Sequence, residues 1–250
     1  MKKAIVIIPA RFASTRFPGK PLVKIGGKTM IERVYEQANQ CAQVSQIFVA
    51  TDHEEILKTV IDFGGNGVMT SVQCQSGTDR CAEVILHRAL NEEIIINIQG
   101  DEPFIQPEQI AELIELMQSD SVKIGTLAKS ITESESLFNP NVVKIVRSKE
   151  GRALYFSRNP IPFIRGVKPD QWIGKADFFQ HVGLYGYKKS TLLALTKLPP
   201  GMLEQAESLE QLRWLEAGYE LFVAETDYES LGIDTPDDLL KAEARISFNQ

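Results

Sequence analysis

A loop near the N-terminus has the side chains that phosphate binding requires. Residues 10–22 contain two hydroxyl groups, a glycine and three cations, Arg11, Arg16 and Lys20. Such cations can neutralise a triphosphate and a departing pyrophosphate, and exposed main-chain N–H groups can hold phosphate oxygens. Two nearby sequences resemble a Walker A motif, but neither is complete. Lys20 is followed by proline, and the Gly27-Lys28-Thr29 run has Leu22 where the first glycine belongs. We predict a nucleotide-phosphate site here; a solvated surface loop is the alternative.

Two acidic positions predict a magnesium site. Asp101 and Glu102 follow Gly100 directly after an apolar run, and this glycine would let the backbone approach a ligand closely. Mg²⁺ takes one or two carboxylates and completes its coordination with phosphate oxygens and water. Asp234 precedes Thr235, which begins a helix as its N-cap, so Asp234 is available as a second ligand. The alternative for both aspartates is a structural role in a turn or cap.

These loops must be held by regular elements, and strand-length apolar runs alternate with helical patterns through the first half of the chain. The pattern predicts strands at 4–8, 46–50, 68–70 and 94–98 and helices at 30–39, 54–63, 79–90 and 107–117. This alternation predicts an α/β fold with a mostly parallel, Rossmann-like sheet and helices on both faces. Ligands of such sheets bind beyond the carboxyl ends of the strands, so the loops after Ile8, Ala50 and Ile98 should form the site.

The second half of the chain has a different pattern. It predicts strands at 122–131, 142–146, 153–156 and 182–187, an irregular loop at 159–174, and helices at 190–197, 203–217 and 236–246. We therefore expect a single domain over residues 1–250, with a smaller mixed lobe within about 122–220.

Composition excludes several classes of protein. The 250 residues are 43% hydrophobic, and 27 basic against 33 acidic residues give a net charge of −6, which argues against a nucleic-acid partner. The first apolar run stops at Pro9, too early for a signal peptide, and no run approaches the about 18 apolar residues of a membrane span. Three cysteines without a CxxC pair argue against structural zinc and suit a cytoplasmic protein.

Taken together, the motifs resemble those of the 3-deoxy-manno-octulosonate cytidylyltransferase (CMP-Kdo synthetase) family. The resemblance runs from about residue 4 to 245 with the motifs in order. The matching segments are IPAR at 8–11, STR at 14–16, PGKPL at 18–22, ATD at 50–52, QSGTDR at 75–80, QGDEP at 99–103, ALYFSR at 153–158, HVGLYGY at 181–187, ESLEQLR at 207–213 and DTP at 234–236. The run 199–203 departs somewhat from the family pattern, which leaves the shape of that loop open.

The resemblance implies a nucleotidyltransferase that joins CMP from CTP to 3-deoxy-manno-octulosonate (Kdo) and releases pyrophosphate. It further implies Mg²⁺ as cofactor, a homodimer, sugar binding and dimerisation by the smaller lobe, and a role in lipopolysaccharide inner-core synthesis. The implied CTP contacts are Ala10, Arg11, Ser14, Lys20, Ser76, Thr78, Arg80, Gln99 and Asp101. The implied sugar contacts are Gln99, Arg158, His181, Tyr185, Glu210 and Gln211. Lys20, Asp101 and Asp234 are the implied catalytic residues, and the two aspartates the implied metal ligands.

Each sugar-side residue also has a structural alternative when it is considered alone. His181 could be a packing histidine and Tyr185 a core aromatic residue. Glu210 and Gln211 could lie on the solvated face of a helix, and Arg158 could stabilise the turn that follows it. Only their joint match to the family favours sugar binding.

Three other functions fit parts of the pattern. The same chemistry could act on 8-amino-Kdo or on sialic acid. A metal-dependent glycosyltransferase would be expected to carry a DxD-type pair, whereas Asp101 is followed by Glu102 and proline. A non-catalytic nucleotide sensor would be expected to have lost Lys20, Asp101 or Asp234, and all three are present.

Overall fold

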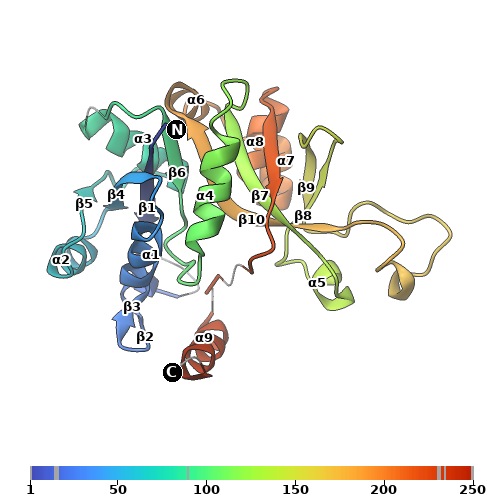
Figure 1. Ribbon diagram of the computed structural model, residues 1–250, viewed down its shortest axis with the longest axis horizontal. Coiled ribbons are helices and arrows are strands. Elements are labelled where there is room, and N and C mark those ends of the chain that lie inside the picture. Colours follow the sequence, from blue (N-terminus) through green and yellow to red (C-terminus); the bar gives the residue numbers. More distant parts are fainter. Residues whose placement is uncertain (1, 14–16, 89, 230–231, 234, 249–250) are drawn as a thin grey trace.

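One nine-stranded sheet organises the computed structural model, which describes residues 2–13, 17–88, 90–229, 232–233 and 235–248 (Figure 1). From edge to edge its strands are β11 (Leu221–Glu225), β7 (Ile124–Ser130), β10 (Phe179–Lys188), β6 (Ile94–Asn97), β1 (Ala4–Ala10), β4 (Val44–Thr51) and β5 (Gly67–Met69). Strand β8 (Lys144–Arg147) pairs with β10, and β9 (Ala153–Ser157) pairs with β8. A short hairpin, β2 (Lys24–Ile25) and β3 (Lys28–Thr29), lies apart from this sheet.

Along the seven-strand path from β11 to β5, four of the six neighbouring pairs run parallel, as the strand–helix alternation predicts. The pairs β6–β1, β1–β4, β4–β5 and β11–β7 are parallel, whereas β10 runs antiparallel to β6, β7 and β8. Strands from both halves of the chain thus form one sheet. Strands β8 and β9, with the connections beside them, extend from its side (Figure 1).

Helices cover both faces of the sheet, which confirms the predicted layers. The helices are α1 (Met30–Asn39), α2 (Glu54–Asp62), α3 (Gly77–Arg88), α4 (Pro107–Leu116), α5 (Ser134–Phe138), α6 (Lys189–Leu195), α7 (Met202–Glu207), α8 (Gln211–Glu216) and α9 (Pro236–Phe248), with 3₁₀ turns η1 (Lys20–Leu22) and η2 (Pro169–Gln171). In β1, Ile5 and Ile7 join a core with α3, α6 and α8, while Val6 and Ile8 join one with α1, α2 and α4. Alternate side chains of a strand point to opposite faces, so β1 contributes to both cores.

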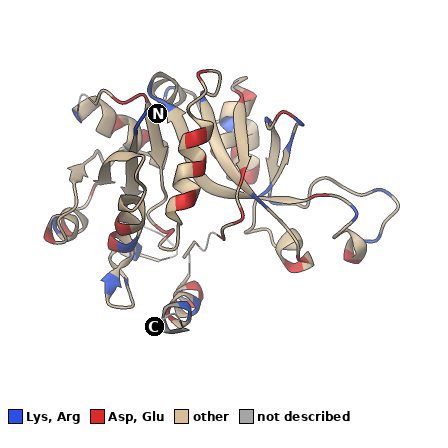
Figure 2. Ribbon diagram, viewed as in Figure 1, with Lys and Arg blue, Asp and Glu red and all other residues tan. Residues whose placement is uncertain are grey.

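The helix ends follow the capping rules in the sequence. Thr235 and Asp238 cap the start of α9 reciprocally: the Asp238 N–H donates to the Thr235 hydroxyl at 3.2 Å, and the Thr235 N–H donates to the Asp238 carboxylate at 3.0 Å. This confirms the predicted N-cap. In α4 the acidic residues lie on the outward side, because Ile110, Leu113 and Ile114 are buried (Figure 2).

Two predictions for the second half of the chain are wrong. The single helix expected at 203–217 is divided into α7 and α8, because Ser208 adopts a left-handed conformation with φ 52°. The periodicity alone does not reveal this break, since apolar residues continue on both sides of it. The edge strand β11 was missed, because a run of five residues gives a weak pattern, although Gly218 precedes it as a turn signal.

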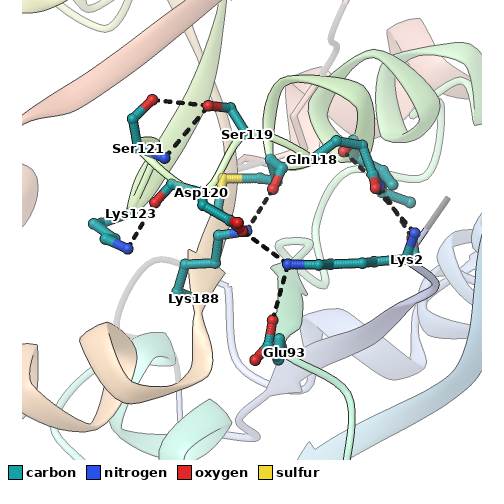
Figure 3. A network of polar contacts seen from close by, with 10 residues as sticks. Lys2, Glu93, Gln118, Ser119, Asp120, Ser121, Lys123 and Lys188 are labelled. Carbon is teal, nitrogen blue, oxygen red and sulfur yellow. Dashed lines mark hydrogen bonds and ion pairs between the residues drawn. The ribbon is translucent and has the colours of Figure 1, made fainter.

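A polar network joins the segments at the end of the sheet where β1 begins (Figure 3). The Lys2 ammonium group donates to Glu93 at 3.1 Å and to Asp120 at 2.8 Å, while buried Lys188 donates to the Met117 carbonyl at 2.7 Å. Lys123 donates to the carbonyl oxygen of Asp120. These contacts join the starts of β1 and β6 to the α4–β7 connection and to the end of β10. The predicted site loops lie at the opposite end, where β1 and β6 end. Within the described residues, no helix combines the length and the apolar character that a membrane span needs.

Strand β10 tolerates side chains differently at its two glycines, which allows a matched test of packing. A Cβ at Gly186 would lie 2.7 Å from Met117 Cγ, whereas a Cβ at Gly183 would meet no atom within 4 Å. We expect Gly186→Ala to lower the free energy of unfolding by about 1–3 kcal/mol through overpacking. Gly183→Ala should change it by no more than about 0.5 kcal/mol. Urea unfolding measures both values, and equal effects would contradict this description of the core.

Candidate active site

The predicted loops converge around a small cavity beyond the carboxyl ends of the sheet strands. It has a volume of about 120 Å³ and is lined by Pro9, Arg11, Cys74, Gln75, Ser76, Gly77, Arg80 and Gln99. Arg11 follows β1, Gln99 follows β6, and residues 74–77 lead into α3. The expected nucleotide-side positions Arg11, Ser76, Arg80 and Gln99 therefore lie around one space. Ala10 is buried at the end of β1, beside them in the chain.

Arg80 is fixed by partners from two neighbouring strand ends. Its side chain is almost fully buried, and its guanidinium group donates to Asp52 at 2.5 Å and to the Thr70 hydroxyl at 2.7 Å. Asp52 follows β4 and Thr70 follows β5. Sequence reasoning placed Asp52 at a strand end without a role; its role here is to hold Arg80 at the rim of the cavity.

The start of α3 is stabilised from within the loop. The carboxylate of Asp79 accepts hydrogen bonds from the N–H groups of Gln75 and Ser76, both at 3.0 Å, and the Asp79 N–H donates to the Ser76 hydroxyl at 3.1 Å. Asp79 had no predicted role, and the structure assigns it this capping function.

Glu210 connects the nucleotide side of the site to the expected sugar side. The Thr78 hydroxyl donates to its carboxylate at 2.9 Å, and the Ser76 side chain is a second hydrogen-bond partner. Burial raises the pKa of the Glu210 carboxyl, and these two hydrogen bonds offset the rise only in part. Gln211 follows at the start of α8 with only 4% of its surface exposed. Glu210 therefore lies against the loop that lines the cavity and not on a solvated helix face.

An ion pair joins Lys20 to Asp101. The Lys20 ammonium group lies 2.5 Å from the Asp101 carboxylate, and the two side chains are 13% and 31% exposed. Gly19 takes a left-handed conformation and donates its N–H to the Phe12 carbonyl at 3.1 Å, while the Phe12 ring stacks on His53 with centroids 4.0 Å apart. These contacts hold Lys20 at the carboxyl end of β6.

Gly100 allows the segment after β6 to pack closely against β1. A Cβ on Gly100 would lie 2.9 Å from the Pro9 carbonyl oxygen, so a larger residue would push β1 and the segment after β6 apart. The sequence predicted close approach to a ligand at this glycine, and the close neighbour in the structure is the backbone of β1.

Three predicted site residues, Ser14, Arg16 and Asp234, lie outside the described residues. The chain next to Asp234 is close to Asp101, because the Ile233 N–H donates to the Asp101 carbonyl at 3.0 Å. Within the described part of the chain, no group of three or more His, Cys, Asp or Glu residues could hold a metal ion. The magnesium site at Asp101 and Asp234 therefore stays a prediction.

His181 and Tyr185 lie in an aromatic group on β10. The His181 Nε2 atom is 2.9 Å from the Thr126 hydroxyl, and its ring centroid lies 5.0 Å from that of Phe156 and 5.3 Å from that of Tyr185. Tyr185 meets Trp214 of α8 edge to face at 5.2 Å. Burial lowers the pKa of His181 to about 3 and raises that of Tyr185 well above its usual range. Both side chains are thus uncharged at neutral pH.

Arg158 is occupied by main-chain partners. Its Nε donates to the Glu207 carbonyl at 2.7 Å, Nη1 to the Pro140 carbonyl at 3.1 Å and Nη2 to the Ser208 carbonyl at 3.4 Å. The expected contact with a sugar carboxylate stays a prediction, and these bonds leave two of the five guanidinium N–H groups for it.

Cys74 lines the cavity but is not a nucleophile. Its thiol donates to the Glu83 carboxylate at 2.9 Å, and burial, together with this carboxylate, raises the pKa of the thiol to about 12. At neutral pH it stays protonated.

A doubly covered, mostly parallel sheet with paired cations and carboxylates at its carboxyl edge defines an α/β nucleotide-binding enzyme of the nucleotidyltransferase type. A family model described as cytidylyltransferase matches residues 5–225. The chain belongs to the cytidylyltransferase family.

Similar proteins span the full length of the chain. A 3-deoxy-manno-octulosonate cytidylyltransferase from Cytophaga hutchinsonii is 50% identical over 240 residues, 95% of each chain, and one from Porphyromonas gingivalis is 50% identical over 243 residues, 96% of this chain and 95% of the relative. A solved CMP:2-keto-3-deoxy-manno-octonic acid synthetase complexed with CTP is 41% identical with a TM-score of 0.91, covering 99% of this chain and all of that one.

The low pKa of His181 predicts a pH-dependent contribution to stability. Unfolded histidine titrates near pH 6.5, so below that pH the unfolded chain binds a proton that folded His181 does not take up until about pH 3. Stability is lost as pH falls through this window, by up to about 1.4 kcal/mol per pH unit from this residue.

Urea unfolding of His181→Asn between pH 7 and about pH 4 checks this. The variant should lose less stability on acidification than the unsubstituted protein. His87→Asn is the matched control, because the His87 side chain is 54% exposed; it should follow the unsubstituted protein. Parallel curves for all three proteins would contradict a buried, neutral His181.

Proposed function

We propose that this chain transfers CMP from CTP to 3-deoxy-manno-octulosonate and releases pyrophosphate. The observation that carries the proposal is full-length similarity, at 50% identity, to relatives named for this activity. A CTP-bound structure with a TM-score of 0.91 gives independent support for CTP as the nucleotide.

The nucleotide would bind at the cavity between β1, β6 and α3. Ser76, Thr78 and Arg80 would border the cytosine, and Gln99 would reach the ribose or the sugar. Ala10, Arg11 and the loop around Ser14 would hold the phosphates. The positions of Arg11, Ser76, Arg80 and Gln99 around one cavity support this arrangement.

Lys20 and Asp101 would act on the phosphates as an exchangeable pair. In the structure, the ammonium group of Lys20 lies against Asp101. A bound triphosphate offers Lys20 a stronger partner than Asp101. Once Lys20 has moved to the phosphates, the Asp101 carboxylate would be available to a cation. Lys20 would then stabilise the charge of the leaving pyrophosphate while the sugar hydroxyl attacks the α-phosphorus in line.

The donor set fits Mg²⁺ bound together with the nucleotide. Asp101 offers one part-exposed carboxylate, and Asp234 would supply the second, which the Ile233–Asp101 hydrogen bond supports. One or two carboxylates with phosphate oxygens suffice for this ion. When bound, Mg²⁺ would lower the pKa of the attacking hydroxyl and neutralise phosphate charge.

The sugar acid would lie over β10 and the start of α8. His181, Tyr185, Glu210 and Gln211 would contact its hydroxyl groups. The neutral His181 ring can exchange hydrogen bonds but cannot supply a positive charge. Its role would therefore be orientation of the sugar.

We further propose a cytoplasmic homodimer that serves lipopolysaccharide inner-core synthesis. Exposed apolar side chains in and near β9 support dimerisation through this region, since Leu154 is 60% and Phe163 74% exposed.

Pyrophosphate release tests the substrate. The protein with CTP and Mg²⁺ should release pyrophosphate with Kdo, and not with 8-amino-Kdo or sialic acid. Release with another acid alone would move the substrate assignment, and no release with any acid would overturn the enzymatic proposal.

Asp101→Asn tests the central carboxylate. The substitution should reduce kcat by at least about 100-fold. The proposed metal-binding carboxylate would stabilise the transition state by several kcal/mol, and the amide would lose this stabilisation. Asp62→Asn, at the exposed end of α2, is the control and should keep normal activity. Normal turnover in a folded Asp101→Asn protein would contradict the proposed site.

Metal removal tests the cofactor. Chelation with EDTA should abolish pyrophosphate release, and added Mg²⁺ should restore it, because the triphosphate charge is then neutralised again. Full activity in EDTA would exclude a magnesium-dependent reaction.

A further inference from the structure

The turn between α7 and α8 has an unfavourable backbone conformation. Ser208, with φ 52° and ψ 50°, is the one residue other than glycine with a positive φ in the described part of the chain. A side chain with a Cβ is disfavoured there, so other contacts must stabilise the turn. Ser208 is exposed and its hydroxyl has no hydrogen-bond partner among the described residues.

The N–H groups of Ser208 and Leu209 donate to the Glu204 carbonyl, and Arg158 supplies further contacts. Two of its guanidinium nitrogens donate to the carbonyl oxygens of Glu207 and Ser208, the peptide groups that flank the turn. Its own main-chain N–H donates to the Glu207 carboxylate at 2.9 Å. The planar guanidinium group, with its N–H donors in fixed directions, suits these acceptors. A lysine ammonium group could not reach the same set of acceptors.

Further hydrogen bonds surround Arg158 and Glu207. The Ser157 hydroxyl donates to the Glu207 carboxylate at 2.7 Å. The third guanidinium nitrogen of Arg158 donates to the Pro140 carbonyl, and buried Lys144 donates to the Asn139 carbonyl at 2.8 Å. Arg158 therefore joins the end of β9, the segment after α5 and the α7–α8 turn.

The turn determines where the next residues lie. Directly after Ser208, Leu209 enters the core, Glu210 reaches Thr78 of α3, and Gln211 is buried at the start of α8. If the turn relaxed toward a continuous helix, Glu210 would move away from the loop that lines the cavity. The hydrogen bond that joins α8 to α3 depends on this one backbone conformation.

We infer that Arg158 is a positioning residue, which acts on the reaction by holding the Ser208 turn so that Glu210 and Gln211 face the site. This inference rests on the proposed function for its kinetic consequence. Three of the five guanidinium N–H groups of Arg158 serve this positioning role, since each donates to a main-chain carbonyl.

A double-mutant cycle with Arg158→Lys and Ser208→Gly tests the inference. Arg158→Lys should lower kcat/KM by roughly 10- to 100-fold, since small displacements of orienting groups have effects of this order. Glycine adopts the left-handed conformation without a Cβ penalty. In the Ser208→Gly background, the same Arg158→Lys change should therefore cost less than about threefold.

A structural readout accompanies the kinetics. Hydrogen–deuterium exchange of residues 202–213 should become faster in Arg158→Lys and return toward normal in the double variant. Arg152→Lys is the matched control, because Arg152 is an exposed arginine paired with Glu220; it should change neither readout. Urea unfolding verifies that each variant is folded.

The outcomes separate the two possible roles of Arg158. Direct sugar binding would raise KM for the sugar acid selectively in Arg158→Lys, with no rescue by Ser208→Gly and no change in exchange, and this result would overturn the inference. Inactivity of the unsubstituted protein would overturn the proposed reaction. In that case the exchange measurements still decide whether Arg158 holds the turn.

Discussion

The parallel register of β1 between β4 and β6 is the constraint on which the site depends. Ala10 pairs with Thr51, and Ile7 pairs with Asn97, so the loops that carry Arg11, Asp52 and Gln99 leave the sheet at one edge. A shift of one residue would turn every side chain of β1 to the opposite face and remove both cores at once. Burial on the two faces therefore enforces the alignment of the site.

Charges in the site are paired before any substrate binds. Lys20 contacts Asp101, Arg80 contacts Asp52, and Glu210 accepts hydrogen bonds from the start of α3. The Arg80 pair is buried and structural, whereas the Lys20 pair is part-exposed and can exchange partners. A highly charged substrate thus meets groups that are already oriented, which reduces the reorganisation that binding and reaction require.

The sugar side depends on contacts between distant parts of the chain. Glu210 and Thr78 are separated by 132 positions, yet their hydrogen bond joins α8 to α3. The aromatic group of His181, Tyr185 and Trp214 fills the space between β10 and α8. The proposed sugar contacts and the core packing therefore share the same side chains.

The sequence by itself determined the α/β class, the end of the sheet at which the motif loops gather, most helix and strand positions, and the family. These follow from local periodicity, capping residues and short motifs, each contained within a few neighbouring residues. Only the tertiary structure decided that β10 enters the sheet antiparallel, that β11 forms its edge, and that Ser208 divides a helix. It also decided that Asp52 holds Arg80 and that Arg158 contacts main-chain carbonyls. Such contacts depend on strand order and on the packing of distant segments, which local sequence patterns do not encode.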